Sequence, residues 1–206
     1  MTKPPLILIA AAALAVLWAM QHARRVDDMP DQETTVIDDV LVTLDPSTYD
    51  PAPVEPDTVQ TNVRATLDMI AYSEGTGDSY NILFGGGHFD SYADHPRQLF
   101  NFTNRRGETL KTTAAGRYQF LARTWDALRD KLALPDFGPE SQDTAALELI
   151  RQRGALKDAE AGRIAAVMQK CAPIWASLPG AGYAQPERKQ GELIAAFTQS
   201  GGIVAT

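Results

Sequence analysis

A single glutamate has the surroundings that a general acid needs. Glu74 lies in the stretch AYSEGTGD, residues 71–78, where apolar residues at helical spacing give way to Gly75 and Gly77. Because glycines end helices, Glu74 is expected in the last turn, at the negative end of the helix dipole. That field raises the pKa of a carboxyl, and a carboxyl protonated near neutral pH can break a glycosidic bond. The alternative is a solvated surface glutamate.

The residues alone leave the number of catalytic carboxyl groups open. Glycoside hydrolysis commonly uses two, which lie about 5 Å or about 6.5–9.5 Å apart. Asp78 is the nearest acid along the chain, but it lies in the glycine-rich break, and Asp94 is expected to cap a turn before Pro96. Glu74 therefore acts either alone or with Asp78 or Asp94 as the second group of a hydrolase.

From Leu67 onward the chain resembles the endolysins of the lambda-type phages, a family of lysozyme-like lytic transglycosylases. The similar blocks are LDMIAYSEGT (67–76), YNILFGGGHFDSYADHPRQL (80–99), TAAGRYQFLARTWDALRDKLAL (113–134), FGPESQDTAALELIRQRGAL (137–156) and IWASLPGAGY (174–183). The resemblance implies an α+β fold, mostly helical with a small β region. It also implies that Glu74 is the catalytic acid and base.

The same resemblance implies which residues bind the substrate. It places the AGRYQFL block along a sugar-binding cleft, so Tyr118 and Gln119 are expected to contact the glycan, although the residues alone would place Tyr118 in the core. Tyr80, Asn81 and Tyr183 are expected to contact it as well. Asn81 is a departure, because some family members carry an aspartate after the tyrosine that opens the second block, and asparagine cannot titrate.

The mechanism that the resemblance implies needs one carboxyl group. Glu74 protonates the oxygen between MurNAc and GlcNAc in peptidoglycan. It then takes the proton of the MurNAc C6 hydroxyl, which attacks C1 and gives a 1,6-anhydro sugar. Two other functions remain open: a hydrolytic lysozyme (a muramidase), and a catalytically idle domain that binds murein as a structural membrane protein of a virion.

No metal or cofactor is expected. His88 and His95 are two of only three histidines, and no HExxH or comparable ligand spacing accompanies them. The glycines at 85–87 are not followed by the lysine of a phosphate-binding loop, so they predict a tight turn. Cys171 is the only cysteine and is expected in the core.

The negative charge of the chain belongs to one segment. The 206 residues have a net charge of −7, and 44% of them are hydrophobic, which is ordinary for a globular protein. Residues 26–63 contain ten acidic side chains and no Lys or Arg, whereas residues 64–206 contain 16 acidic and 16 basic ones. The second part is therefore neutral and lacks the basic footprint of a nucleic-acid-binding protein.

The N-terminus carries an unbroken apolar run, Leu6–Met20. As a helix it would be about 22 Å long, which is short for a hydrocarbon core of about 30 Å, and Trp18 suits the membrane interface. We expect residues 1–25 to form an uncleaved signal anchor that holds the protein in a membrane, because Ala19-Met20-Gln21 is a poor cleavage site. A cleaved signal peptide and a buried helix are the alternatives.

Charge leaves the orientation of this anchor open, since Lys3 lies on one side of the run and Arg24 and Arg25 lie on the other. Because peptidoglycan lies outside the cytoplasmic membrane, the domain is expected to face the periplasm from the inner membrane. The alternative is a virion-associated membrane protein.

Residues 26–60 are expected to form an extended linker, because they are acidic and rich in proline. Within it, residues 34–44 (TTVIDDVLVTL) are β-branched and could pair as a strand with a virion or membrane protein. The lysozyme-like domain is expected over residues 61–206.

Apolar spacing within that domain predicts a series of helices around one irregular region. Thr61 or Asn62 is expected to cap the first helix, and Ser141 the third. The expected helices cover about 62–74, 118–132, 141–153, 160–177 with an interruption near Pro173, and 186–199, and the irregular or hairpin region covers 78–112.

Overall fold

The structure is a computed structural model that describes residues 55–104, 106–182 and 187–205. The expected anchor at 1–25 and most of the expected linker lie outside these residues. Within them the chain is mostly helical with one small sheet, so the predicted α+β class is confirmed. The elements are α2 (Pro56–Glu74), β1 (Phe100–Thr103), β2 (Thr109–Thr112), α3 (Ala122–Leu132), α4 (Pro139–Gln152), α5 (Leu156–Glu160), α6 (Ile164–Cys171) and α7 (Gln190–Gln199).

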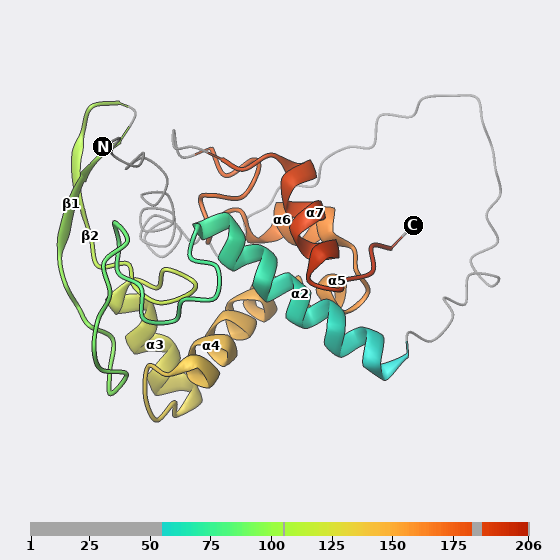
Figure 1. Cartoon of the computed structure of the whole chain (residues 1–206), viewed down its shortest axis with the longest axis horizontal. Coiled ribbons are helices and arrows are strands. Elements are labelled where there is room, and N and C mark those ends of the chain that lie inside the picture. Colours follow the sequence, from blue (N-terminus) through green and yellow to red (C-terminus); the bar gives the residue numbers. More distant parts are fainter. Residues whose placement is uncertain (1–54, 105, 183–186, 206) are drawn as a thin grey trace, which may run out of the picture.

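The helix α2 crosses the middle of the molecule and contacts α4, α5 and α7 (Figure 1). Its buried side chains include Ala65, Met69 and Ile70, which recur at helical spacing and face the core. Because the last residue of this central helix is Glu74, the packing of α2 fixes where that carboxyl group lies.

The start of α2 differs from the prediction. The helix begins at Pro56, inside the segment assigned to the linker, because proline suits the first helical position, and Glu55 is the N-cap. Asn62 does not cap the helix, since its amide donates to Glu160 O at 3.0 Å and its side-chain oxygen accepts from Ile203 N–H at 2.8 Å. Thr61 bonds back to Asp57 O.

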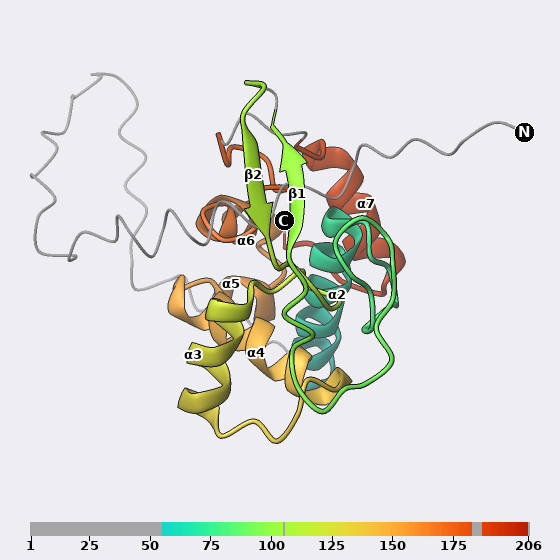
Figure 2. The ribbon, with the colours of Figure 1, turned by 90° about the vertical axis from the view of Figure 1, so that its left-hand side faces the viewer.

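The small sheet is an antiparallel hairpin. β1 pairs with β2 in a register that places Phe100 opposite Thr112 and Thr103 opposite Thr109. Figure 2 shows the two strands extending beyond the helices at one side of the molecule. Phe84 attaches the hairpin to the preceding loop, because its ring lies 5.9 Å from Phe100 and 5.6 Å from Phe102 between centroids.

Three later helix boundaries also differ from the prediction. α3 begins at Ala122 because Gln119 has a positive φ of 50°, which no helix accommodates. α4 begins at Pro139, so Ser141 lies inside the helix and does not cap it. The Ser141 hydroxyl donates to Asp136 instead. The helix predicted at 160–177, with an interruption near Pro173, is shorter in the structure. α5 ends at Glu160, Gly162 turns the chain with φ 72°, and α6 runs from Ile164 to Cys171, just before the predicted interruption.

One contiguous core underlies these elements. Its largest fully buried side chains include Trp125, Trp175, Tyr118, Phe137 and Phe197. Trp125 and Phe137 meet edge to face, with 4.6 Å between ring centroids. Cys171 is fully buried, as predicted.

No helix in the described part of the chain is both long and apolar enough to cross a membrane. The apolar run Leu6–Met20 lies outside that part.

Candidate active site

Glu74 occupies the last position of α2, as predicted from the two glycines. Gly75 follows as the C-cap in the left-handed conformation, with φ 73°. The hydroxyl of Thr76 donates to Arg117 O at 2.6 Å, which holds the chain after Glu74 against the turn before α3. Glu74 is only 2% exposed, so the alternative of a solvated surface glutamate is wrong.

The Glu74 carboxyl group accepts a hydrogen bond from a neutral group, the hydroxyl of Ser177. Ser177 Oγ lies 2.6 Å from Glu74 Oε1 and 2.9 Å from Ser73 Oγ, and the Ser73 hydroxyl donates to Ile70 O at 2.7 Å. No lysine or arginine within the described ranges forms an ion pair with Glu74. The carboxyl group is therefore buried with one hydrogen-bonding partner and no ion pair in the described residues.

Burial raises the pKa of Glu74 to about 8, while the Ser177 hydrogen bond and the charge of Arg188 act in the opposite direction. The predicted direction of the shift is confirmed, but its main cause is desolvation rather than the helix dipole. A carboxyl group with this pKa is mostly protonated at neutral pH and can donate a proton. The arrangement can therefore perform general acid catalysis.

Tyr80 and Asn81 lie in the loop that follows. The Tyr80 hydroxyl donates to Asp143 at 2.9 Å, and the Asn81 amide donates to Phe89 O at 3.2 Å. Both side chains are partly exposed. Their predicted contact with glycan stays a prediction.

Tyr118 and Gln119 are buried instead. Tyr118 is 1% exposed and its hydroxyl donates to Asp143 at 2.6 Å. The Gln119 amide donates to Gly116 O at 3.0 Å, and its side-chain oxygen has no hydrogen-bonding partner in the described residues. A direct sugar contact by either side chain requires their surroundings to open. Their predicted role stays a prediction, and Tyr183 lies outside the described residues.

Arg117 joins several of these groups, and the sequence did not single it out. Its guanidinium donates to Gly77 O at 2.9 Å and to Asp68 at 2.7 Å, and it lies 5.1 Å above the centroid of the Tyr80 ring. It also pairs with Asp78 at 3.2 Å. The loop after Glu74 is thus tied to the turn before α3 through one cation.

The two acids considered as second catalytic groups are both ion-paired. The Asp78 side chain is fully exposed and lies against Arg117. Burial acts to raise the pKa of Asp94, but hydrogen bonds from Arg97, the His95 backbone N–H and Trp125 outweigh it and lower this pKa to about 2. The chain bends at Ala93 and Asp94, and the Asp94 carboxylate accepts from the His95 N–H at 2.8 Å rather than capping a hydrogen-bonded turn.

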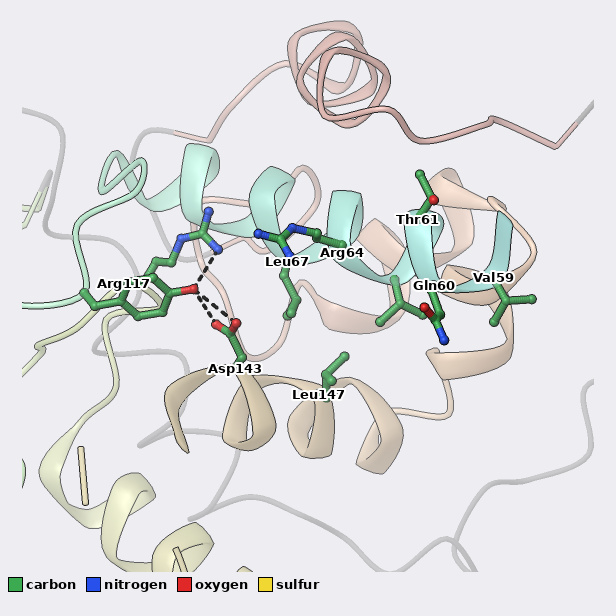
Figure 3. A pocket seen from close by; sticks show the side chains of 10 residues that line it. Val59, Gln60, Thr61, Arg64, Leu67, Arg117, Asp143 and Leu147 are labelled. Carbon is green, nitrogen blue, oxygen red and sulfur yellow. Dashed lines mark hydrogen bonds between the residues drawn. The ribbon is translucent and has the colours of Figure 1, made fainter. Parts of the chain in front are cut away.

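Asp143 lies at one end of a hollow between α2 and α4 (Figure 3). It accepts hydrogen bonds from the hydroxyls of Tyr80 and Tyr118. The hollow has a volume of about 500 Å³, and Leu67 and Leu147 face each other across it. Glu74 does not line it. The candidate active site is therefore defined by the chemistry of the buried acid and not by this cavity.

No group of three His, Cys, Asp or Glu side chains in the described residues could hold a metal ion. His95 is buried. One ring nitrogen lies 2.9 Å from Phe120 O, and the other accepts from the Arg97 N–H at 3.0 Å. Both ring nitrogens of His95 are thus engaged in hydrogen bonds that hold this loop against the core.

Two solved structures show which class of fold this chain has. The chain is similar to the lysozyme of bacteriophage lambda in complex with a chitohexasaccharide, with 47% identity, a TM-score of 0.66, and coverage of 70% of this chain and 97% of that one. A second structure of the lambda lysozyme matches with 46% identity and a TM-score of 0.63. The described fold is therefore lysozyme-like.

Sequence comparison then gives the family. The endolysin family matches residues 64–204. The endolysin of Escherichia phage lambda is 48% identical over 149 residues, which cover 68% of this chain and 92% of the relative. The endolysin of Escherichia phage P2 is 45% identical over 159 residues, which cover 70% and 95%. The chain belongs to the endolysin family and is a peptidoglycan-degrading enzyme of the lysozyme-like kind.

Proposed function

We propose that this endolysin is a lytic transglycosylase that cleaves the β-1,4 bond between MurNAc and GlcNAc, with Glu74 as its acid and base. One observation carries the proposal: Glu74 is buried with a pKa raised to about 8, whereas Asp78 and Asp94 are held by arginines. The chitohexasaccharide in the lambda lysozyme structure supports a β-1,4-linked amino-sugar substrate.

The first step is proton donation. The protonated Glu74 carboxyl group donates to the bridging oxygen, so that the GlcNAc hydroxyl leaves as a neutral group and C1 of MurNAc becomes electron-deficient. The Glu74 carboxylate that remains accepts the Ser177 hydrogen bond, at 2.6 Å in the structure. This hydrogen bond stabilises the ionised form between the two steps.

The second step returns the proton. The Glu74 carboxylate takes the proton of the MurNAc C6 hydroxyl while the oxygen of that hydroxyl attacks C1. The attack forms the 1,6-anhydro ring, and the proton restores the acid. The nucleophile is tethered to the reacting ring, so no second carboxyl group is needed to activate water. Asn81, which cannot titrate, follows Tyr80 where some family members carry an acid.

The product decides between this reaction and hydrolysis. We expect muropeptides that end in 1,6-anhydro-MurNAc and are lighter than hydrolysis products by one water, about 18 Da, because the attack is internal. Digestion of murein in ¹⁸O-water should leave the new ends unlabelled. Reducing ends that carry ¹⁸O would instead show a muramidase, and no release of fragments would show a murein-binding protein.

We further propose that Leu6–Met20 anchors the enzyme in a membrane with the catalytic domain on the peptidoglycan side. The length and unbroken apolarity of the run support this. The full chain should fractionate with membranes, and a chain that begins at Glu55, just before α2, should be soluble and active. A soluble mature protein that begins near Arg24 would show a cleaved signal instead.

A further inference from the structure

Arg188 is held beside the candidate acid by its own backbone and by its neighbour. Its N–H donates to Ser177 O at 2.8 Å, and Ser177 is the residue whose hydroxyl contacts Glu74. The preceding residue, Glu187, accepts hydrogen bonds from the N–H groups of Gly180 and Gly182, each at 2.9 Å. The chain on both sides of the Arg188 side chain is therefore fixed relative to the site.

The Arg188 guanidinium lies on the end of α2. Its central carbon is 5.1 Å from the centroid of the Tyr72 ring. A methyl group placed on Gly75 would lie 3.9 Å from Arg188 Nη2, in ordinary contact. The cation thus stacks on Tyr72 and lies near Gly75, the residue that follows Glu74, and the aromatic face holds its plane in place.

This guanidinium has no anion of its own. In the described residues it makes no ion pair and donates no hydrogen bond, and its Nε is buried without an acceptor. Arg117, on the other side of the loop, pairs with both Asp68 and Asp78. Arg188 as a whole is half-buried, and its charge has no counter-ion in the described residues, so an anion that reaches the guanidinium would form a charge-assisted contact there.

We infer that Arg188, stacked on Tyr72, binds a carboxylate of the stem peptide of murein, and so selects peptide-bearing glycan. The inference rests on the proposed function, because the sugars of peptidoglycan carry hydroxyl and amide groups, whereas its carboxylates lie on the peptides attached to MurNAc. The planar fork of arginine matches a carboxylate through two parallel hydrogen bonds. Glu74 does not compete for Arg188 while it keeps its proton.

The surface next to Tyr72 provides room for the rest of such a peptide. A hollow of about 310 Å³ begins at Tyr72, and Arg188 itself does not line it. Its walls are formed by Tyr72, Gly77, Asp68, Asp78, Arg117, Ala196, Gln199 and Ser200, so the charge of Arg117 is balanced there by two carboxylates. Tyr72 therefore faces both the cation and an open space. A peptide whose carboxylate lies on Arg188 can continue along this hollow.

Binding to a protein that cannot cleave tests the inference independently of the reaction. The probes are GlcNAc-MurNAc carrying its stem peptide and the same disaccharide without peptide, with its lactyl carboxyl group capped as a methylamide so that it carries no charge. Both are titrated by calorimetry into the Glu74→Gln protein. We expect the peptide to tighten binding about tenfold or more, as one charge-assisted contact allows. Adding Arg188→Gln should remove that advantage, and Arg188→Lys should keep part of it.

The matched control is Arg123→Gln, which removes one charge from an exposed arginine of α3 that has no ion pair or hydrogen bond in the described residues. It should leave the advantage of the peptide intact. Equal binding of the two probes, or an advantage that survives Arg188→Gln, would overturn the inference. This outcome is separate from a failure of the proposed function, which shows as an absence of cleavage by the unmodified enzyme.

Cleavage provides the second measurement. For the unmodified enzyme, kcat/KM should be higher on intact sacculi than on peptide-free glycan strands made from them with an amidase, after the lactyl carboxyl groups that the amidase exposes have been capped as methylamides. Arg188→Gln should bring this ratio close to one, mainly through KM on the sacculi. If Arg188→Gln lowers both rates equally and keeps the ratio, Arg188 acts only on Glu74 and the peptide site is excluded.

Discussion

Glu74 on α2 and Glu148 on α4 are both buried on neighbouring helices of one core, at 2% and 7% exposure, yet their pKa values move in opposite directions. Hydrogen bonds from Arg151, Lys131 and Gln152 outweigh burial and lower the pKa of Glu148 to about 2. Burial dominates at Glu74, where the nearest partner is the Ser177 hydroxyl, and the pKa rises to about 8.

The difference lies in the neighbours and not in the depth of burial. Glu148 Oε1 lies 2.6 Å from Lys131 Nζ, and its Oε2 lies 2.6 Å from Arg151 Nε, so its charge is compensated. Glu74 has no cation within ion-pair distance in the described residues, so its neutral form is favoured. Glu148 stabilises the fold as a carboxylate, whereas Glu74 keeps a proton that a reaction can use.

The largest expected effect separates the two glutamates by activity. Glu74→Gln should lower murein cleavage by about 10²–10⁴-fold or more, because one lost general acid has that effect and this group serves in both steps. Glu148→Gln, with the same change of atoms, should keep most of the activity of the folded protein. The measurement is the initial rate of muropeptide release, with far-UV circular dichroism as a check of folding.

A Glu74→Gln protein that keeps more than about a tenth of the activity would remove Glu74 from the reaction. Asp78 and Asp94 would then be the next residues to replace. A Glu148→Gln protein that is folded but inactive would instead show that Glu148 takes part in the reaction and does not only stabilise the fold.

The position of Glu74 at the end of a helix could be predicted from the sequence, because the residues that determine it are its neighbours in the chain. Two glycines fix the end of α2, so the position of Glu74 could be predicted from its own segment, whereas the fold class rested on the resemblance of all five blocks. The burial that raises the pKa could not be predicted in this way. Burial is a property of the folded core, and the hydrogen bond that opposes its effect on the pKa comes from Ser177, which is 103 residues away along the chain.

The partners that complete the site were missed for the same reason. Ser177 and Arg188 lie in or just beyond the block IWASLPGAGY, whose resemblance to the family was the only signal available. Arg117 lies directly before Tyr118, but its contacts with Asp68 and Gly77 join distant segments. Two helix starts differ from the prediction, at Pro56 and Pro139, because proline suits the first helical turn and each helix begins there, ahead of the residue expected to cap it.

Stability should show the next largest effect, with opposite signs at the two glutamates. The pKa of Glu74 is raised from 4.5 to about 8, so its contribution to stability is present below pH 4.5 and is lost as the pH rises through 8. Glu74→Gln should therefore raise the free energy of unfolding by about 3 kcal/mol at pH 7. The gain should vanish near pH 4.

Glu148→Gln should lower the free energy of unfolding by about 1–3 kcal/mol at pH 7, since it removes charge-assisted hydrogen bonds. The pKa of Glu148 is lowered, so its contribution is present above pH 4.5 and is lost as the pH falls toward 2. Urea unfolding of both variants between pH 4 and pH 9 measures these changes. Two variants that shift stability in the same direction at pH 7 would contradict the comparison.

The smallest expected effect concerns the hydroxyl that tunes Glu74. Ser177 donates to the ionised carboxylate and lowers the pKa of Glu74, so Ser177→Ala should raise that pKa further. The active form is the protonated acid, so the alkaline limb of kcat/KM should move to higher pH, by up to about one unit for a neutral hydrogen bond. Ser73→Ala, which removes a hydroxyl that contacts Ser177 and not Glu74, should move the limb less. A limb that moves to lower pH in Ser177→Ala would show that the hydroxyl stabilises the protonated form, and that a group other than Ser177 must stabilise the carboxylate between the two steps.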